Sequence, residues 1–135
     1  MAIVVVAGMA SVQTLVLTNR KAASMRTLNN ARAIVQRNID TALGLPFTAT
    51  QQPAVLALTP SGGSVYDEEG DGDNNVKVAL QSNGTTGLVN GTLTRIVTAE
   101  ANSAGADIRR VTFRLDYTVR SRASSFSMTT LRATD

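Results

Sequence analysis

The chain has 135 residues, the size of one domain. Its hydrophobic share of 43% comes mainly from Ala, Val and Leu, and it has no Trp, so we expect a modest core. The absence of His and Cys excludes a Ser-His-Asp triad, His- or Cys-ligated zinc and disulfides. The net charge is +3, and aromatic residues make up 4% of the chain. A basic surface can bind nucleic acid or anionic lipid, but so few aromatic side chains disfavour a nucleic-acid partner.

The first segment, residues 1–19, is apolar and precedes the first charged side chain, Arg20. As a helix it is roughly 28 Å long, close to the hydrocarbon thickness of a bilayer. A cleaved secretory signal and a buried core helix are the alternative interpretations. No basic residue precedes the apolar run and no break follows it, which disfavours a signal peptide. We therefore expect residues 1–19 to lie in a membrane or in the core of an assembly.

Residues 20–44 continue the helical pattern in amphipathic form. Apolar residues recur every three or four positions and define the stripe that we expect to hold a sheet: Met25, Leu28, Val35 and Ile39. Ala31 or Arg32 falls between Leu28 and Val35, and Ala42 follows Ile39. Gly44 and Pro46 are a stop signal, with Gly44 suited to a left-handed cap. The sequence predicts one continuous helix from near Met1 to near Leu43, roughly 65 Å long.

After Pro46 the composition changes to loop-forming residues. Residues 45–75 are predicted to be a loop region with one short strand at residues 54–58. Residues 76–135 are predicted to form an antiparallel sheet domain. Its strands are expected at Val76–Gln81, Thr92–Ala99, Ile108–Arg120 and Ser125–Arg132.

The third of these strands has the clearest pattern, because apolar residues from Val111 to Val119 alternate with polar ones. Short turn-forming links, including Ser121–Ser124, favour a meander. The dipeptides Asn83-Gly84 and Asn90-Gly91 are predicted to be turns. The fold class is therefore α+β, with a long N-terminal helix packed on a small antiparallel β-meander.

The densest acidic stretch contains Asp67, Glu69, Asp71 and Asp73 at alternate positions, followed by Asn74. Alternating oxygen ligands with Gly72 in sixth place are similar to the first half of an EF-hand loop. The glutamate expected in twelfth place is Val78, and the flanks are not helical. Two interpretations stay open: a structural Ca²⁺ site and a solvated acidic turn. No cofactor is required, and these carboxylates lack an apolar pocket to shift their pKa values, so we do not expect an enzyme.

The order of helix, loop and sheet resembles that of bacterial type IV pilins and type II secretion pseudopilins. The stretch AIVVVAGMASVQTLVLTNRKAASMRTLNNARAIVQ looks like the middle of a pilin N-terminal helix, and VTFRLDYTVRSRASSFSMTTLRA resembles the last two strands of minor pseudopilins. The family's basic leader, processing site and early glutamate are not found in this sequence, whose first acidic residue is Asp40. The apolar pattern aligns Met1 inside the family's helix.

The resemblance implies a structural subunit of a pilus-like filament, stored in the bacterial inner membrane and assembled at the cell surface. Its partners would be other copies of itself and other pilin-like subunits. The residues expected in the filament core are Ile3, Val4, Val5, Val6, Met9, Leu15 and Leu17. The alternative is a bitopic membrane-anchored surface protein whose β domain binds a ligand such as an anionic glycan or DNA.

Overall fold

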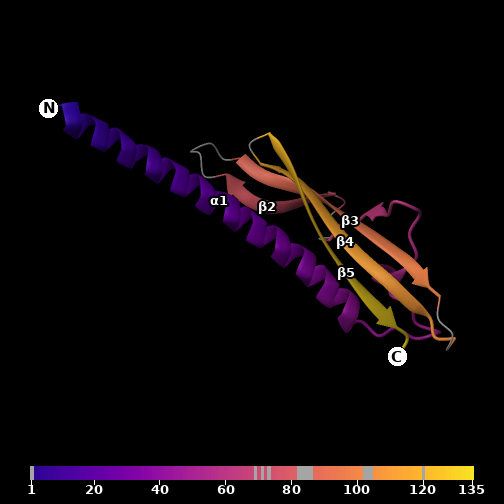
Figure 1. Cartoon of the computed structure of the whole chain (residues 1–135). Helices are drawn as coiled ribbons and strands as arrows, with labels where there is room; N and C mark the ends of the chain where they lie inside the picture. The colour runs from indigo at the N-terminus through magenta and orange to yellow at the C-terminus, as the bar shows by residue number, and fades with distance from the viewer. Residues whose placement is uncertain are drawn as a thin grey trace.

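The computed structural model describes residues 2–68, 70, 72, 74–81, 87–101, 105–119 and 121–135, and the side chains of the N-terminal helix from Val12 onward. The chain forms one long helix, α1 (Ala2–Gly44), and a five-stranded sheet. The prediction of a continuous N-terminal helix is confirmed. The C-terminal part of α1 packs on the sheet, and its N-terminal part projects beyond the sheet (Figure 1).

The sheet consists of β1 (Ser64–Val65), β2 (Asn75–Gln81), β3 (Gly87–Glu100), β4 (Ile108–Val119) and β5 (Arg122–Ala133). The order is β1-β3-β4-β5, and β2 also pairs with β3. Each of these pairings is antiparallel, and the strands from β2 to β5 follow one another as a meander. The α+β class and the antiparallel sheet agree with the sequence prediction.

The register places one face of the sheet toward α1. Leu115 of β4 lies between Leu93 of β3 and Phe126 of β5. Burial alternates along β4 as the sequence predicts, because successive side chains of a strand point to opposite faces. The core-facing residues of β4 are the buried Val111, Phe113, Leu115 and Tyr117.

The core lies between α1 and this face. Ala31, Val35, Ile39 and Ala42 of α1 are buried there with the strand residues. Phe47, three residues after the end of α1, is also buried in this core. The 3₁₀ helix η1 (Ala54–Leu56) adds Val55 and Leu56.

Several local predictions are wrong. Residues 54–58 are not a strand: Val55 and Leu56 are adjacent and both buried, which a 3₁₀ turn permits and a half-buried strand does not. The loop region also contains the short strand β1, which the sequence pattern did not reveal. Gly44 ends α1 without a left-handed cap, since its φ is not positive. Pro46 is sufficient to end the helix, because it disfavours helical geometry at Leu45.

Asn90-Gly91 is not a turn but lies inside β3, whose first residue is Gly87. A Cβ on Gly91 would lie 2.9 Å from Leu115 Cδ1 and 3.0 Å from Val78 Cγ2. This glycine therefore serves close packing between strands. Asn83-Gly84 lies outside the described residues. β5 begins at Arg122, earlier than predicted, because Val119 pairs with Arg122 across a tight hairpin in which Ser121 has a φ of 62°.

Candidate assembly interface

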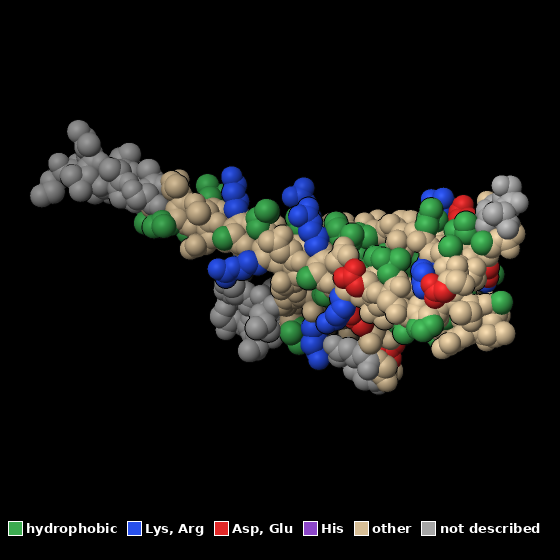
Figure 2. All heavy atoms as spheres, turned by 90° about the horizontal axis from the view of Figure 1, so that it is seen from below, with side chains coloured by type: hydrophobic (Ala, Val, Ile, Leu, Met, Phe, Trp, Pro, Cys, Tyr) green, Lys and Arg blue, Asp and Glu red, His purple; other side chains and the backbone are tan. Residues whose placement is uncertain are grey.

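The candidate interface is the exposed segment of α1 that precedes the part of the helix packed on the sheet. We call residues 12–22 the stem; each of them is exposed, whereas burial on the sheet begins at Ala23. Four stem residues are large and apolar: Val12 is 60% exposed, Leu15 63%, Val16 42% and Leu17 57%. Figure 2 shows hydrophobic side chains on more than one side of the stem, followed along the helix by basic ones.

Of these four residues, Val12, Leu15 and Val16 lie within about 100° of one another around the helix, and Leu17 lies on another side. At about 100° per residue, Leu15, Val16 and Leu17 lie roughly 300°, 40° and 140° around the axis from Val12. A helix that is apolar on several sides is suited to burial on all sides rather than to packing on one surface. Thr18 fits such burial, because its hydroxyl donates a hydrogen bond of 2.8 Å to the Thr14 carbonyl.

Of the residues predicted for the filament core, Leu15 and Leu17 are therefore placed on the exposed stem. Ile3, Val4, Val5, Val6 and Met9 belong to the backbone of α1, but their side chains lie outside the described part of the chain. Within the described residues, no helix combines the length and the apolar character needed to cross a membrane.

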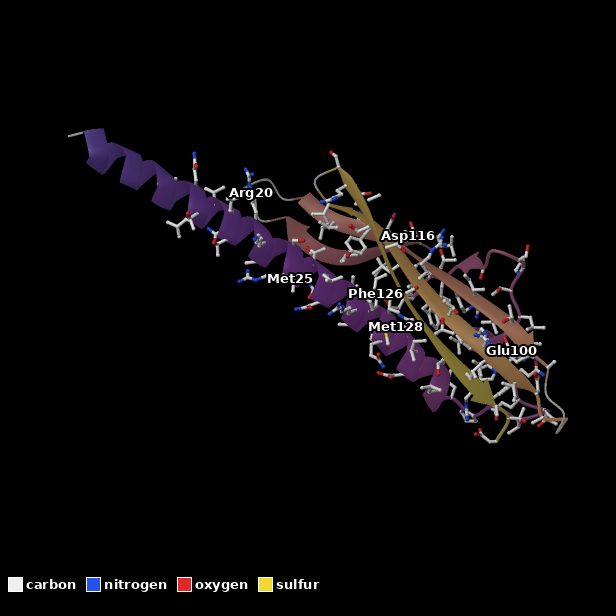
Figure 3. All side chains as sticks on the ribbon, viewed as in Figure 1. Arg20, Met25, Glu100, Asp116, Phe126 and Met128 are labelled. Carbon is white, nitrogen blue, oxygen red and sulfur yellow. The ribbon has the colours of Figure 1, made fainter. Side chains whose placement is uncertain are left out.

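Of the four residues predicted to hold the sheet, Val35 and Ile39 are buried in the core, and Leu28 is half-buried. Met25 is 56% exposed, so its assignment to the helix–sheet contact is wrong. It lies about 120° around the helix from Ala31, on the side away from the sheet (Figure 3). The true stripe is narrower and includes two polar residues, the buried Thr27 and Asn38.

Polar contacts that the sequence analysis missed fix the docked half of α1, residues 23–44. Asn30 Nδ2 donates to the Val78 carbonyl at 3.1 Å. Glu68 accepts from Arg37 Nε at 2.7 Å and from Asn38 Nδ2 at 2.9 Å. The position of Asn38, seven residues after Ala31 and three after Val35, is the only sequence signal that indicates its burial.

A second group of contacts ties the C-terminal end of the chain to the end of α1. Phe47 N–H donates to Asp135 Oδ2 at 3.0 Å, and Asp135 N–H donates to the Phe47 carbonyl at 2.8 Å. Arg132 donates to Asp135 Oδ1 at 2.7 Å and to the Leu45 carbonyl at 3.2 Å. The Phe47 amide, followed by Arg132, lowers the pKa of the Asp135 carboxyl below its ordinary value. We call this arrangement the terminal clasp.

The acidic stretch is only partly described, because Glu69, Asp71 and Asp73 lie outside the described residues. Both carboxylate oxygens of Asp67 are engaged by backbone: Gly70 N–H donates to Oδ1 at 2.7 Å, and Gly72 N–H donates to Oδ2 at 2.8 Å. Both glycines have positive φ, at 69° and 79°. No group of three potential ligands that could hold a metal ion occurs among the described residues. The Ca²⁺ interpretation stays a prediction.

Comparison with known proteins leaves the family open, because no protein family, curated protein or solved structure matches this chain.

Proposed function

We propose that this protein is a structural, non-enzymatic subunit of a pilus-like filament that assembles through the N-terminal part of α1. The observation that carries the proposal is the exposed apolar stem on a helix whose C-terminal turns, residues 23–44, are docked on a sheet. Exposed apolar surface of this kind marks an interaction site. The partners are other copies of the chain, and pilin-like subunits where they are co-assembled. Before assembly the stem lies in the inner membrane, and afterwards in a surface filament.

The energetics favour a buried stem. Burial of a Val or Leu side chain contributes about 1.5–3 kcal/mol. Burial of the four exposed apolar side chains therefore stabilises the assembly by about 6–12 kcal/mol per subunit. The entropic cost of association opposes this gain. Because the apolar residues lie on several sides of the helix, bundling with more than one neighbour buries more of them than a simple dimer does.

The alternative is a membrane-anchored surface protein whose β domain binds an anionic glycan or DNA. Such a domain needs unpaired basic side chains on the sheet. On the face of the sheet turned away from α1, Arg110 and Arg114 are each paired with a carboxylate, Glu100 at 2.6 Å and Asp116 at 2.8 Å. Lys77 on this face and Arg122 at the start of β5 form no ion pair with another described residue, but they are not neighbours on one face. This arrangement gives the alternative less support than the stem gives the filament.

The test compares two equally exposed leucines. Leu15→Asp places a charge on the stem, and Leu131→Asp places one on β5, where Leu131 is 57% exposed. Each variant is expressed in a cell that makes the filament, and membrane fractions and fibres are examined by immunoblotting and electron microscopy. We expect Leu15→Asp to reach the membrane and form no fibres, whereas Leu131→Asp forms fibres normally. Normal fibres from Leu15→Asp would refute the helix-bundle core.

A further inference from the structure

A groove opens where α1 and the sheet diverge. Its volume is about 970 Å³, and it lies between the start of the docked half of α1 and the β4–β5 hairpin end of the sheet. Its lining includes Arg20, Arg26 and Thr27 on the helix and Tyr117, Arg122 and Ser124 on the strands. The hydrogen bond from Asn30 to the Val78 carbonyl joins helix and sheet at the groove, since Asn30 is also part of its lining.

The sequence of α1 explains why the groove stays open. Continued toward the N-terminus at about 100° per residue, the face that carries Ala31 and Val35 passes through Thr27, Ser24 and Arg20. The stripe that packs on the sheet therefore changes from apolar to polar and then to cationic. Closing the sheet over Arg20 would bury an unpaired charge, which costs several kcal/mol. The helix and sheet consequently separate at this point.

The charge of the groove is of one sign. Arg20 and Arg26 of α1 and Arg122 of β5 are among its lining residues, and no Asp or Glu occurs among the described residues that line it. None of these three arginines forms an ion pair with another described residue, in contrast to Arg110 and Arg114 on the opposite face of the sheet. The chemistry fits a phosphate, because guanidinium groups bind phosphate oxygens in bidentate geometry.

We propose that the groove binds the head group of an anionic membrane phospholipid while the apolar part of the stem, up to Leu17, lies in the acyl region of the bilayer. This inference rests on the proposed function, which places the stem in lipid before assembly. Leu17 and Arg20 are about 4.5 Å apart along the helix axis. The head-group layer on each side of a bilayer is about 5–8 Å thick. Arg20 therefore lies at head-group depth when Leu17 is at the edge of the hydrocarbon, with the groove opening beside it.

The test uses the full chain and flotation with vesicles of phosphatidylcholine alone or with phosphatidylglycerol added. Arg20→Gln/Arg122→Gln removes two groove cations. Lys21→Gln/Arg114→Gln removes the same net charge outside the groove, with Lys21 adjacent to Arg20 at nearly the same depth. Diffuse attraction to an anionic surface accounts for about fivefold per basic side chain, so we expect the groove pair to lose clearly more than about 30-fold. The control pair loses about fivefold at most. Circular dichroism checks that all variants keep the fold.

Three outcomes would overturn the proposal. A loss of no more than about 30-fold for the groove pair, or equal losses for the two pairs, would reduce it to diffuse attraction by charge. Equal binding of the unaltered protein to both vesicle types would remove the requirement for an anionic lipid. Loss of fibres from the groove pair with undiminished vesicle binding would assign the groove to a contact between subunits. Conversely, a protein that never forms fibres but shows the expected vesicle result would retain the groove and refute the filament.

Discussion

The two parts of α1 are one uninterrupted helix in opposite environments. The docked half, residues 23–44, buries Ala31, Val35 and Ala42 completely against the sheet. The stem has more bulky apolar residues for its length, yet each of its side chains is exposed. Hydrophobicity alone therefore does not decide which part of a helix joins the core of its own domain. The residues on the face toward the sheet decide it: the docked half places Ala31, Val35 and Ala42 there, and toward the stem the same face carries Ser24 and then Arg20.

The two parts of α1 also differ in the contacts that stabilise them. Helices in proteins gain most of their stability from packing of one face. The docked half has that packing, supplemented by Asn30, Asn38 and Arg37. The side chains of the described stem are exposed, so the stem lacks the packing that the docked half has, and the proposed filament would supply it.

The largest contrast is expected when the same charge is placed in each part. Val35→Asp buries an unpaired carboxylate in the core and should destabilise the domain by at least about 3–5 kcal/mol. Leu15→Asp should change the stability of the unassembled protein by no more than about 0.5 kcal/mol. Urea unfolding followed by circular dichroism measures both. A similar loss of stability from Leu15→Asp would mean that the stem packs on the domain.

The sheet that receives the docked half can be tested at Gly91. A methyl group there would meet Leu115 at 2.9 Å and the Asp116 carbonyl oxygen at 3.0 Å. Overpacking of this kind costs about 1–3 kcal/mol, so Gly91→Ala should lower the urea midpoint accordingly. Gly62→Ala is not a suitable control, because its φ is 99°. Thr98→Ala is the suitable control: Thr98 is an exposed residue of β3, so its replacement should hardly change the urea midpoint. An unchanged midpoint for Gly91→Ala would show that the strands can move apart there.

Removal of residues 1–20 tests whether the docked half of α1 is stable without most of the stem. The docked half begins at Ala23, so the truncated chain should keep its sheet and lose less than about 1 kcal/mol of unfolding free energy. It should also be a soluble monomer, because the apolar stem is gone. Sedimentation and amide exchange of β4 provide the measurements. A truncated protein that still polymerises would locate the assembly interface in the sheet domain.

The smallest effect concerns the terminal clasp. The folded-state pKa of Asp135 is lowered, so its stabilising contribution is present above the unfolded pKa of about 3.9 and is lost as the pH falls through the folded value. Acidification below about pH 4 should therefore expose the Phe47 amide to exchange before the sheet unfolds. Asp135→Asn should remove this pH dependence, and Asp40→Asn serves as the matched control on α1. If exchange of the Phe47 amide has the same pH profile in Asp135→Asn and in the unaltered protein, the Asp135 carboxylate does not stabilise this end of the chain.

The sequence determined the features that arise from local patterning. Periodicity near 3.6 marked the long helix and Val35 and Ile39 in its buried stripe, and Pro46 marked its end. Alternation in Val111, Phe113, Leu115 and Tyr117 marked the buried face of β4. The exposed, apolar character of Leu15 and Leu17 could also be anticipated, because the apolar residues of their segment lie on more than one side of the helix.

Tertiary structure alone decided the rest. Asn90-Gly91 satisfies the local rule for a turn, but Leu115 and Val78 require a residue without a side chain at that point of β3. Met25 continues a plausible apolar stripe, yet the sheet meets the face centred on Ala31. The groove beside Arg20 exists because a helix face becomes cationic where a strand hairpin ends, and Arg122 reaches it from more than a hundred positions along the chain. Such features depend on contacts between distant segments, which no local pattern encodes.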